Sequence, residues 1–319
     1  MIPTCTIGGM SSHRGQRIRG TFFLTRVEAS PPGAEHTRVL LEDGTGSRWA
    51  SCRTTALRFR PALPQPIDAL IDLQLQGSGI LVVQIYPVEI DLLPSASWVL
   101  PIEHCPAPAV DALVRLHNLE ESLPEPLSGF LKRVLLDPSI GLPMLRCRAS
   151  VAHHHSFVGG LLVHSTDQLD VALAASRQAL PNEPLSWQLA QLGYFLHDVG
   201  KLKSVGEAAR PVHALVSHHE THNLLVLAPH LQWLESVDRD LAAALTYILE
   251  FVATPARARG QAKYLVAEMV VALDQWSSAT HNGRGLGSLL KKNIRPFGEI
   301  IAAEAANEEY AFTERHGER

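Results

Sequence analysis

Histidine and aspartate are concentrated in one part of the chain. Ten of the sixteen histidines lie between His153 and His230, and no cysteine occurs in that stretch. Imidazole nitrogens and carboxylate oxygens are donors that suit divalent ions such as Mn, Fe, Zn or Mg. Residues 195–201 (FLHDVGK) place His197 and Asp198 side by side at the end of an apolar run. Adjacent helical residues differ in direction by about 100°, so this dyad can face one ion only at a helix end or between helices.

Two other segments supply matching donors. Residues 154–165 (HHSFVGGLLVHS) contain a glycine pair that opens a predicted helix carrying His164. Asp274 interrupts an otherwise apolar predicted helix. Lys201 follows the dyad directly, and it is predicted either to contact a phosphate oxygen or to interact with the negative end of its own helix. The pattern as a whole indicates a centre for a divalent metal ion.

His164, the His197–Asp198 dyad and Asp274 resemble the H…HD…D signature of the HD metal-dependent phosphohydrolase superfamily. The string HHxxxxGGLLxHS, which spans residues 153–165, is similar to that of the YhaM-type 3′-to-5′ exoribonucleases, in which a barrel precedes the HD domain. This resemblance covers residues 18–280. It implies that the four residues bind a first divalent metal, with Mn favoured over Fe, Mg or Zn, and that Asp198 bridges to a second metal.

Members of the family with two metals use further histidines on the helices after the dyad. The resemblance favours His219 and His222, which are three residues apart and can share one helix face. The competing candidates are His213 and His218. Residues 240–252 depart from the family pattern because they lack a histidine pair, which puts the second metal in question and leaves Glu250 as an oxygen substitute. The remaining candidates, His154 and His155, are either ligands, residues that support the ligands, or structural residues.

Residues 17–90 predict a small barrel. Segments rich in β-branched and aromatic residues alternate with turn-forming ones. The predicted strands are 19–27, 37–41, 48–52, 67–76 and 80–90. A tight turn at 42–46 (EDGTG) joins the second strand to the third. Five strands with a long loop after the third favour an OB-like barrel, with an SH3-like barrel as the alternative.

Arginine is enriched in the barrel region. Between Ser11 and Arg60 there are nine arginines and four acidic residues, and no lysine occurs before Lys132. Arginine can stack on bases as well as pair with phosphate, which favours binding of single-stranded nucleic acid. A compositional bias toward arginine codons is the alternative explanation. The candidates for contact with nucleic acid are Arg19, Arg38, Arg48, Trp49 and Arg53.

Beyond a proline-rich stretch at 94–108, apolar residues recur at helical spacing. The predicted helices are 110–121, 127–136, 160–180, 185–197, 211–228, 240–252 and 261–278. We therefore expect a multidomain chain with a small all-β barrel followed by an all-α domain. The expected regions are an OB-like barrel at 1–92, a linker with leading helices at 93–150, an HD domain at 151–280 and a C-terminal extension at 281–319.

Composition excludes several classes of protein. The chain has 319 residues, of which 46% are hydrophobic and 19% charged, as expected for a folded protein. A net charge of −4 argues against indiscriminate binding of polyanions. No apolar run reaches the length of a membrane span. The four cysteines form no CxxC pair, and the N-terminus lacks the pattern of a signal peptide, so we expect reduced thiols and a cytoplasmic location.

These features predict a metal-dependent phosphodiester hydrolase that binds single-stranded RNA or DNA on the barrel. The resemblance to the YhaM-type enzymes implies that it degrades the strand from the 3′ end, a direction that the residues themselves leave open. One alternative is a DNA relaxase of the MobH type, because those proteins resemble the same histidine strings, although they are usually longer and lack an N-terminal barrel. Another is a non-catalytic regulator that binds nucleic acid and retains the HD fold. The sequence leaves the oligomeric state open.

Overall fold

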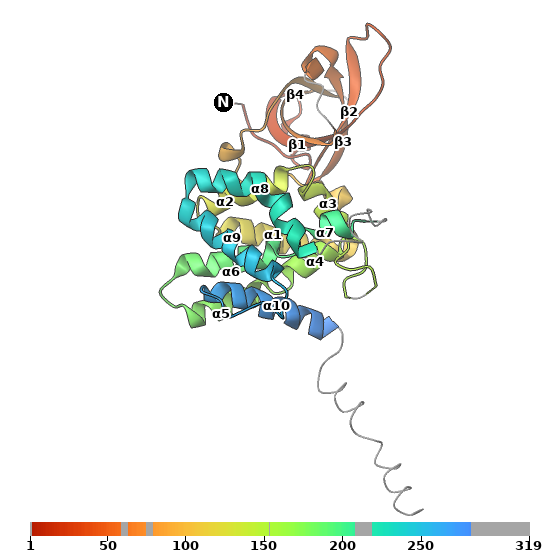
Figure 1. Cartoon of the computed structure of the whole chain (residues 1–319). Coiled ribbons are helices and arrows are strands. Elements are labelled where there is room, and N and C mark those ends of the chain that lie inside the picture. The colour runs from red at the N-terminus through yellow and green to blue at the C-terminus, as the bar shows by residue number, and fades with distance from the viewer. Residues whose placement is uncertain (1, 59–62, 75–78, 153, 208–218, 282–319) are drawn as a thin grey trace, which may run out of the picture. The chain divides into compact units, whose positions relative to one another are not determined.

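The computed structural model describes residues 2–58, 63–74, 79–152, 154–207 and 219–281. Its N-terminal part is a closed five-stranded barrel, and the rest is helical (Figure 1). The strands are β1 (Arg17–Val27), β2 (His36–Asp43), β3 (Gly46–Arg53), β4 (Gln65–Leu73) and β5 (Ile80–Tyr86). They follow the order β1-β2-β3-β5-β4, and β4 pairs back with β1. Only the β3–β5 pair is parallel among these strands, an arrangement consistent with the predicted OB-like barrel.

The side chains of β1 contribute to two hydrophobic cores, one inside the barrel and one in the helical part. Ile18, Phe22 and Leu24 of β1 point into the barrel, where they join apolar residues of the other four strands. Phe23 points the opposite way and belongs to the core of the helical part. A strand exposes successive side chains on opposite faces, so a single strand contributes to both cores.

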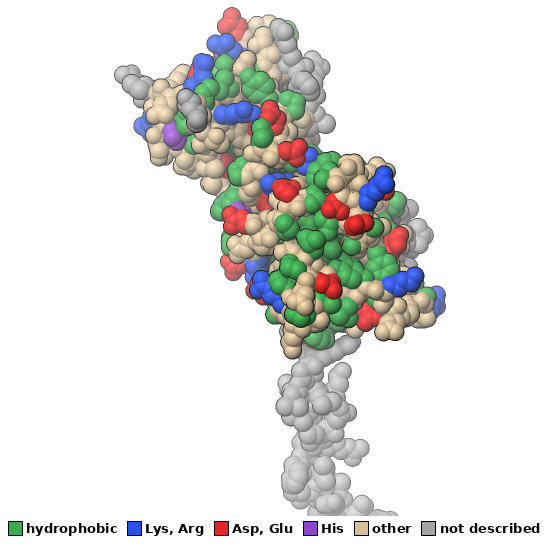
Figure 2. All heavy atoms as spheres, turned by 90° about the vertical axis from the view of Figure 1, so that its left-hand side faces the viewer, with side chains coloured by type: hydrophobic (Ala, Val, Ile, Leu, Met, Phe, Trp, Pro, Cys, Tyr) green, Lys and Arg blue, Asp and Glu red, His purple; other side chains and the backbone are tan. Residues whose placement is uncertain are grey.

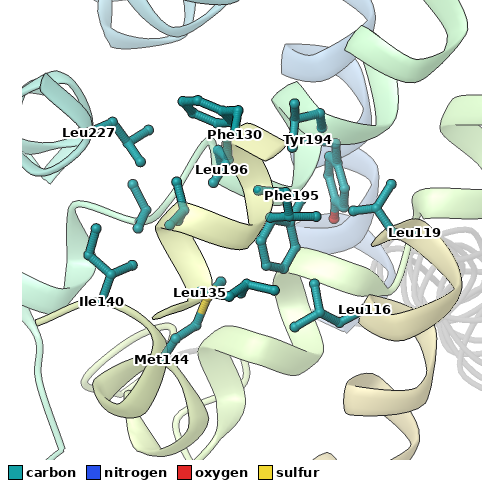
Figure 3. Close-up of a cluster of buried hydrophobic side chains, with 14 of the residues drawn as sticks. Leu116, Leu119, Phe130, Leu135, Ile140, Met144, Tyr194, Phe195, Leu196 and Leu227 are labelled. Atoms are coloured by element: carbon teal, nitrogen blue, oxygen red, sulfur yellow. The ribbon is translucent and has the colours of Figure 1, made fainter. Parts of the chain in front are cut away.

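The helical part begins after Ala109. The helices are α1 (Val110–Ser122), α2 (Leu127–Leu136), α3 (Gly141–Arg146), α4 (Gly160–Thr166), α5 (Leu169–Ala179), α6 (Pro184–Leu196), α7 (Lys201–Ser204), α8 (His219–Val237), α9 (Arg239–Ala253) and α10 (Leu265–His281). Their core includes Phe130, Tyr194, Phe195 and Leu196, all fully buried, packed with leucines of α1, α2 and α8 (Figure 3). Because α6 is apolar on nearly all sides, its C-terminal end lies inside this core.

Two expected helices differ from the prediction. The helix expected over 160–180 is interrupted after Thr166, because the Tyr194 hydroxyl donates to the His164 carbonyl oxygen at 3.0 Å and competes for the acceptor that a continuing helix would use. In the second case, the helix expected over 211–228, residues 211–218 lie outside the described residues, and α8 continues through Pro229, where the prediction placed a break. The carbonyl that proline leaves without a donor is that of Leu225, whose side chain is 69% exposed, so water can reach that side of the helix.

The strand expected over 80–90 ends earlier, at Tyr86, because Pro87 has no N–H to donate to the sheet. The chain divides into two compact units, Met1–Asp274 and Gln275–Arg319, so the barrel and most of the helices share one unit. The expected extension at 281–319 lies almost wholly outside the described residues. No helix in the described part of the chain has the length and apolarity needed to cross a bilayer.

Candidate metal centre and barrel surface

The dyad lies where α6 ends. His197 and Asp198 are 1% and 3% exposed. His197 Nδ1 lies 2.5 Å from the Tyr194 carbonyl oxygen, which can only accept, so Nδ1 is the donor. The Tyr194 ring also stacks on the imidazole, with ring centroids 5.0 Å apart. This pairing fixes the tautomer in which Nε2 of a neutral His197 carries a lone pair, as a metal ligand requires.

The turn after the dyad is held by α8. Asn223 is fully buried, and its Oδ1 accepts from the Gly200 N–H at 2.7 Å while its Nδ2 donates to the His197 carbonyl oxygen. A Cβ on Gly200 would lie 2.1 Å from the His219 carbonyl oxygen. The glycine of the HDVGK segment is therefore required because the first turn of α8 packs directly against it. Sequence reasoning missed Asn223; its only signal was a polar residue on a predicted apolar helix.

The glycine pair before α4 positions His164. Gly159 has a φ of +85°, a conformation that residues with a side chain rarely adopt. A Cβ on Gly160 would lie 1.9 Å from the His155 carbonyl oxygen. Both glycines are thus needed for α4 to begin against the preceding loop, and His164, one turn later, is fully buried.

Cys147, in the segment after α3, contacts both the start of α4 and the residues that follow the dyad. Cys147 accepts the Leu161 N–H through its carbonyl oxygen at 2.9 Å, and its thiol lies 3.6 Å from the Lys201 carbonyl oxygen. Burial raises the pKa of the Cys147 thiol to about 12. All four cysteines are buried, and none of them forms a disulfide in the structure.

Three segments, α4, the turn after α6 and α10, bring His164, His197, Asp198 and Asp274 into one donor group. One nitrogen or carboxylate oxygen from each lies within 4.8 Å of the others. His164 Nε2 is 3.0 Å from Asp198 Oδ2 and 3.3 Å from Asp274 Oδ1. His197 Nε2 is 3.4 Å from each of the same two oxygens. Two imidazoles and two carboxylates form a donor set that fits a divalent ion of the Mn, Fe or Zn type.

The carboxylates dominate the electrostatics of this group. Burial disfavours a charged imidazole, but the negative charges of Asp198 and Asp274 outweigh it and raise the pKa of His197 to about 10. The same balance raises the pKa of His164. Burial opposes ionisation of the two carboxyls as well, yet their basic neighbours hold both pKa values well below the usual range. The two carboxylates therefore favour positive charge at the centre, as protons on the imidazoles or as a cation that the four residues could hold.

Both oxygens of Asp198 have further basic neighbours. The Lys201 ammonium pairs with Asp198 Oδ2, and His219 Nε2 lies 3.0 Å from Asp198 Oδ1. His219 is therefore beside the centre. His222 belongs to neither of the donor groups formed by the described residues, and Glu250 is exposed on α9. The competing candidates His213 and His218 lie outside the described residues.

A second donor group adjoins the first and shares His164. It comprises His155, His164 and Asp167, whose donor atoms also lie within 4.8 Å of one another. The Tyr194 hydroxyl lies 2.5 Å from Asp167 Oδ1, and His155 Nε2 is 3.6 Å from Asp167 Oδ2. The ring of His154 is 5.2 Å from that of His164. Burial and then the charge of His164 lower the pKa of His154 to about 4.

Asp167 and Tyr194 were not among the candidates from sequence. The only sequence signal for these two residues was their spacing from the predicted ligands. Asp167 lies three residues after His164, and Tyr194 lies three residues before His197. Comparison of the chain with protein-family models, with curated proteins and with solved structures found no match. The chemistry of the centre therefore follows from its donor atoms and their geometry.

The predicted nucleic-acid contacts fall into two places on the barrel. Arg38, Trp49 and Arg53 are exposed on β2 and β3, and the Arg38 guanidinium lies over the Trp49 ring, 4.8 Å from its centre. Arg48 is exposed at the start of β3. Arg19 lies elsewhere, on β1.

The surroundings of Arg19 are acidic. Its guanidinium is 2.7 Å from Asp68 and 3.9 Å from Glu89. An arginine that faces two carboxylates is less suited to a phosphate than Arg48 and Arg53, which form no ion pair with a residue that the structure describes. Arg38 pairs with one carboxylate, that of Glu28, at 3.1 Å. On the face shown in Figure 2, basic and acidic side chains are interspersed over the helical part.

Proposed function

We propose that the chain is a metal-dependent phosphodiesterase of the HD type that degrades single-stranded RNA or DNA from its 3′ end. The observation that carries this proposal is the donor group of His164, His197, Asp198 and Asp274, assembled from segments up to 110 residues apart. Buried groups of this kind are costly unless they bind a partner of opposite charge. A divalent cation, with Mn favoured, is the partner that matches their chemistry.

His164, His197, Asp198 and Asp274 would hold the metal. When bound, such an ion offsets phosphate charge and lowers the pKa of a water molecule toward neutrality. The chain's own residues orient the site: the Tyr194 carbonyl fixes the His197 tautomer, and Asn223 holds the turn on which the dyad lies.

Lys201 contributes a positive charge beside Asp198. The two predicted roles of this lysine are a contact with a phosphate oxygen and an interaction with the negative end of its own helix, and its place beside the dyad is compatible with the first. Hydrolysis adds water across the phosphorus–oxygen bond of the diester, leaving a hydroxyl on one product and a phosphate monoester on the other. A cation beside the centre favours binding of the anionic diester.

The barrel supplies a surface for the strand. Arg38 and Arg53 offer cations, and Trp49 offers an aromatic ring that is 38% exposed. Exposed arginine together with an exposed aromatic ring is typical of sequence-tolerant binding to single strands. The binding constant should fall with salt in proportion to the phosphates neutralised.

The test combines metal analysis with strand cleavage. Purified protein should contain at least one equivalent of transition metal, and the His197→Ala and Asp274→Ala variants should lose it. With Mn, a linear strand labelled at its 5′ end should give a ladder of shortened products, while a closed single-stranded circle should survive. The Trp187→Phe variant, altered far along α6, is the matched control and should cleave normally.

Other outcomes would contradict the proposal. Wild-type protein that cannot bind Mn, Fe or Zn would exclude a metal enzyme. Cleavage of a circle at one position would instead support the relaxase alternative. Metal binding and strand binding without any hydrolysis would support the non-catalytic regulator.

A further inference from the structure

A cavity of about 380 Å³ opens at one end of the barrel. Its walls come from the segment 7–14 before β1, from the start of β3, and from the ends of β4 and β5 that face each other. A volume of this size falls in the range that holds a small organic ligand. None of these segments contributes to the metal centre.

The lining of this cavity is apolar at the bottom and basic at the rim. Ile7, Met10 and Leu73 belong to the buried barrel core and form an apolar floor. Arg14 and Arg48 are both exposed and line the cavity. Neither arginine forms an ion pair with any residue that the structure describes, and no carboxylate is among the described residues that line the cavity.

Trp49 and Gln74 complete the wall. Trp49 is 38% exposed, and the guanidinium of Arg38 lies over its ring. The Gln74 side chain packs over Gly79, where a Cβ would approach its Oε1 to 2.0 Å. The cavity therefore combines an aromatic surface, an amide and two cations without a carboxylate counterpart. These groups complement a flat heteroaromatic ring joined to a phosphate.

A second cavity, lined by the barrel and by the segment 89–99 that follows it, serves as a comparison. It measures about 420 Å³, and Arg19 lines it together with Asp43, Asp68 and Glu89. Three carboxylates against one arginine make that cavity unfavourable for an anion. Size alone thus does not distinguish the two cavities, but charge does.

We propose that the cavity between Arg14, Arg48 and Trp49 binds one nucleotide unit of a single strand, with the base against the apolar floor and Trp49 and the phosphate at the two arginines. This inference rests on the proposed function, because it assigns a subsite to the strand that the barrel binds. The pocket would hold one nucleotide, whereas Arg38 and Arg53 elsewhere on the barrel would contact the phosphate backbone of the strand.

The test measures binding in EDTA, so that hydrolysis does not consume the probe. Wild type and variants are titrated with adenosine 5′-monophosphate, adenosine, inorganic phosphate and a single-stranded ten-mer. Binding is followed by tryptophan fluorescence. The part of the fluorescence change that is absent in Trp49→Phe comes from Trp49 and reports binding in the pocket. Arg14→Ala and Arg48→Ala should each raise the dissociation constants for the monophosphate and the ten-mer about tenfold, as expected for the loss of a charged hydrogen bond.

Arg17→Ala is the matched control. Arg17 is also an exposed arginine of the barrel, but it pairs with Asp72 and does not line the cavity. Its removal changes the net charge equally and should alter the dissociation constants by less than twofold. Thermal unfolding of each variant, followed by circular dichroism, shows whether the barrel remains intact.

The outcomes separate the pocket from the enzyme. Arginine-dependent binding of the monophosphate supports the pocket even if no strand is hydrolysed, in which case only the proposed function fails. Equal binding by Arg14→Ala, Arg48→Ala and Arg17→Ala would overturn the pocket, whatever the hydrolysis assay shows. Inorganic phosphate competing as well as the monophosphate would also overturn it, because the base would then contribute nothing.

Discussion

Asn223 connects α8 to the turn that carries the dyad, so its removal tests whether that turn must be held for metal binding. In Asn223→Ala, the Gly200 N–H loses its acceptor and the His197 carbonyl oxygen loses a donor. Leaving a buried polar group without its partner costs about 1–3 kcal/mol. The two groups together predict a loss of about 2–6 kcal/mol in the free energy of unfolding. Because groups that orient metal ligands affect affinity, we also expect Mn affinity to fall about 10- to 100-fold.

The assay needs a control that separates lost stability from lost affinity. Leu234 is fully buried on the same helix, eleven residues beyond Asn223, or about 16 Å along the axis. Leu234→Ala should destabilise the protein by a similar amount, about 2–5 kcal/mol, by creating a cavity. Urea unfolding gives the stability of each variant, and calorimetric titration with Mn under folding conditions gives its affinity.

The two variants should differ only in metal affinity. Asn223→Ala should bind Mn weakly even at temperatures where it is fully folded, and Leu234→Ala should bind it as wild type does. Equal Mn affinity in Asn223→Ala and wild type would refute the reasoning that the asparagine positions the dyad. An equal loss in both variants would show that affinity follows global stability instead.

Three further predictions concern the glycine loop, the acid stability and the metal. Gly160→Ala should lower the free energy of unfolding by about 3 kcal/mol in urea, since its Cβ would overlap a backbone carbonyl, whereas Gly260→Ala, with nothing within 4 Å, should change it little. The hydrogen bond from His230 lowers the pKa of Asp137 to about 2 against the usual 3.8, so this contribution is complete above pH 4 and is lost as the pH falls toward 2. The stability advantage of wild type over Asp137→Asn should therefore shrink by about 1 kcal/mol between pH 6 and pH 3, and a constant difference would contradict this. Adding Mn at 100 times its dissociation constant to stripped wild type should stabilise it by about 2.7 kcal/mol and raise the melting temperature, but not in Asp274→Ala, and less so at pH 5 because protons compete for the ligands.

Local patterns predicted much of the fold. The β-branched segments and the EDGTG turn indicated the strands of a barrel, and the structure confirms a five-stranded barrel followed by helices. Helices such as Leu127–Leu136 were predicted to the residue because their boundaries depend on nearby prolines and apolar spacing. The break after Thr166 was not predictable, since it depends on a hydroxyl from Tyr194, 28 residues later.

The centre was predictable only where residue type and spacing were informative. His164 and the dyad were identified from glycine-flanked strings, and the structure brings them together with Asp274. Asn223 could not be found in this way, because its role depends on where α8 meets the turn. The position of Arg19 was equally hidden, since strand register places it beside Asp68 rather than among the other arginines.

Because Cys147 is buried, its rate of alkylation reports how often the region around the dyad opens. Its thiol is 1% exposed beneath the Lys201 carbonyl, and its raised pKa leaves almost no reactive thiolate at neutral pH. An alkylating reagent can therefore modify it only during excursions in which the loop and the turn separate. The alkylation rate of the peptide containing Cys147, followed by mass spectrometry, measures how often those excursions occur. A ligand that stabilises the turn after the dyad should lower the alkylation rate of Cys147 at a constant concentration of the reagent.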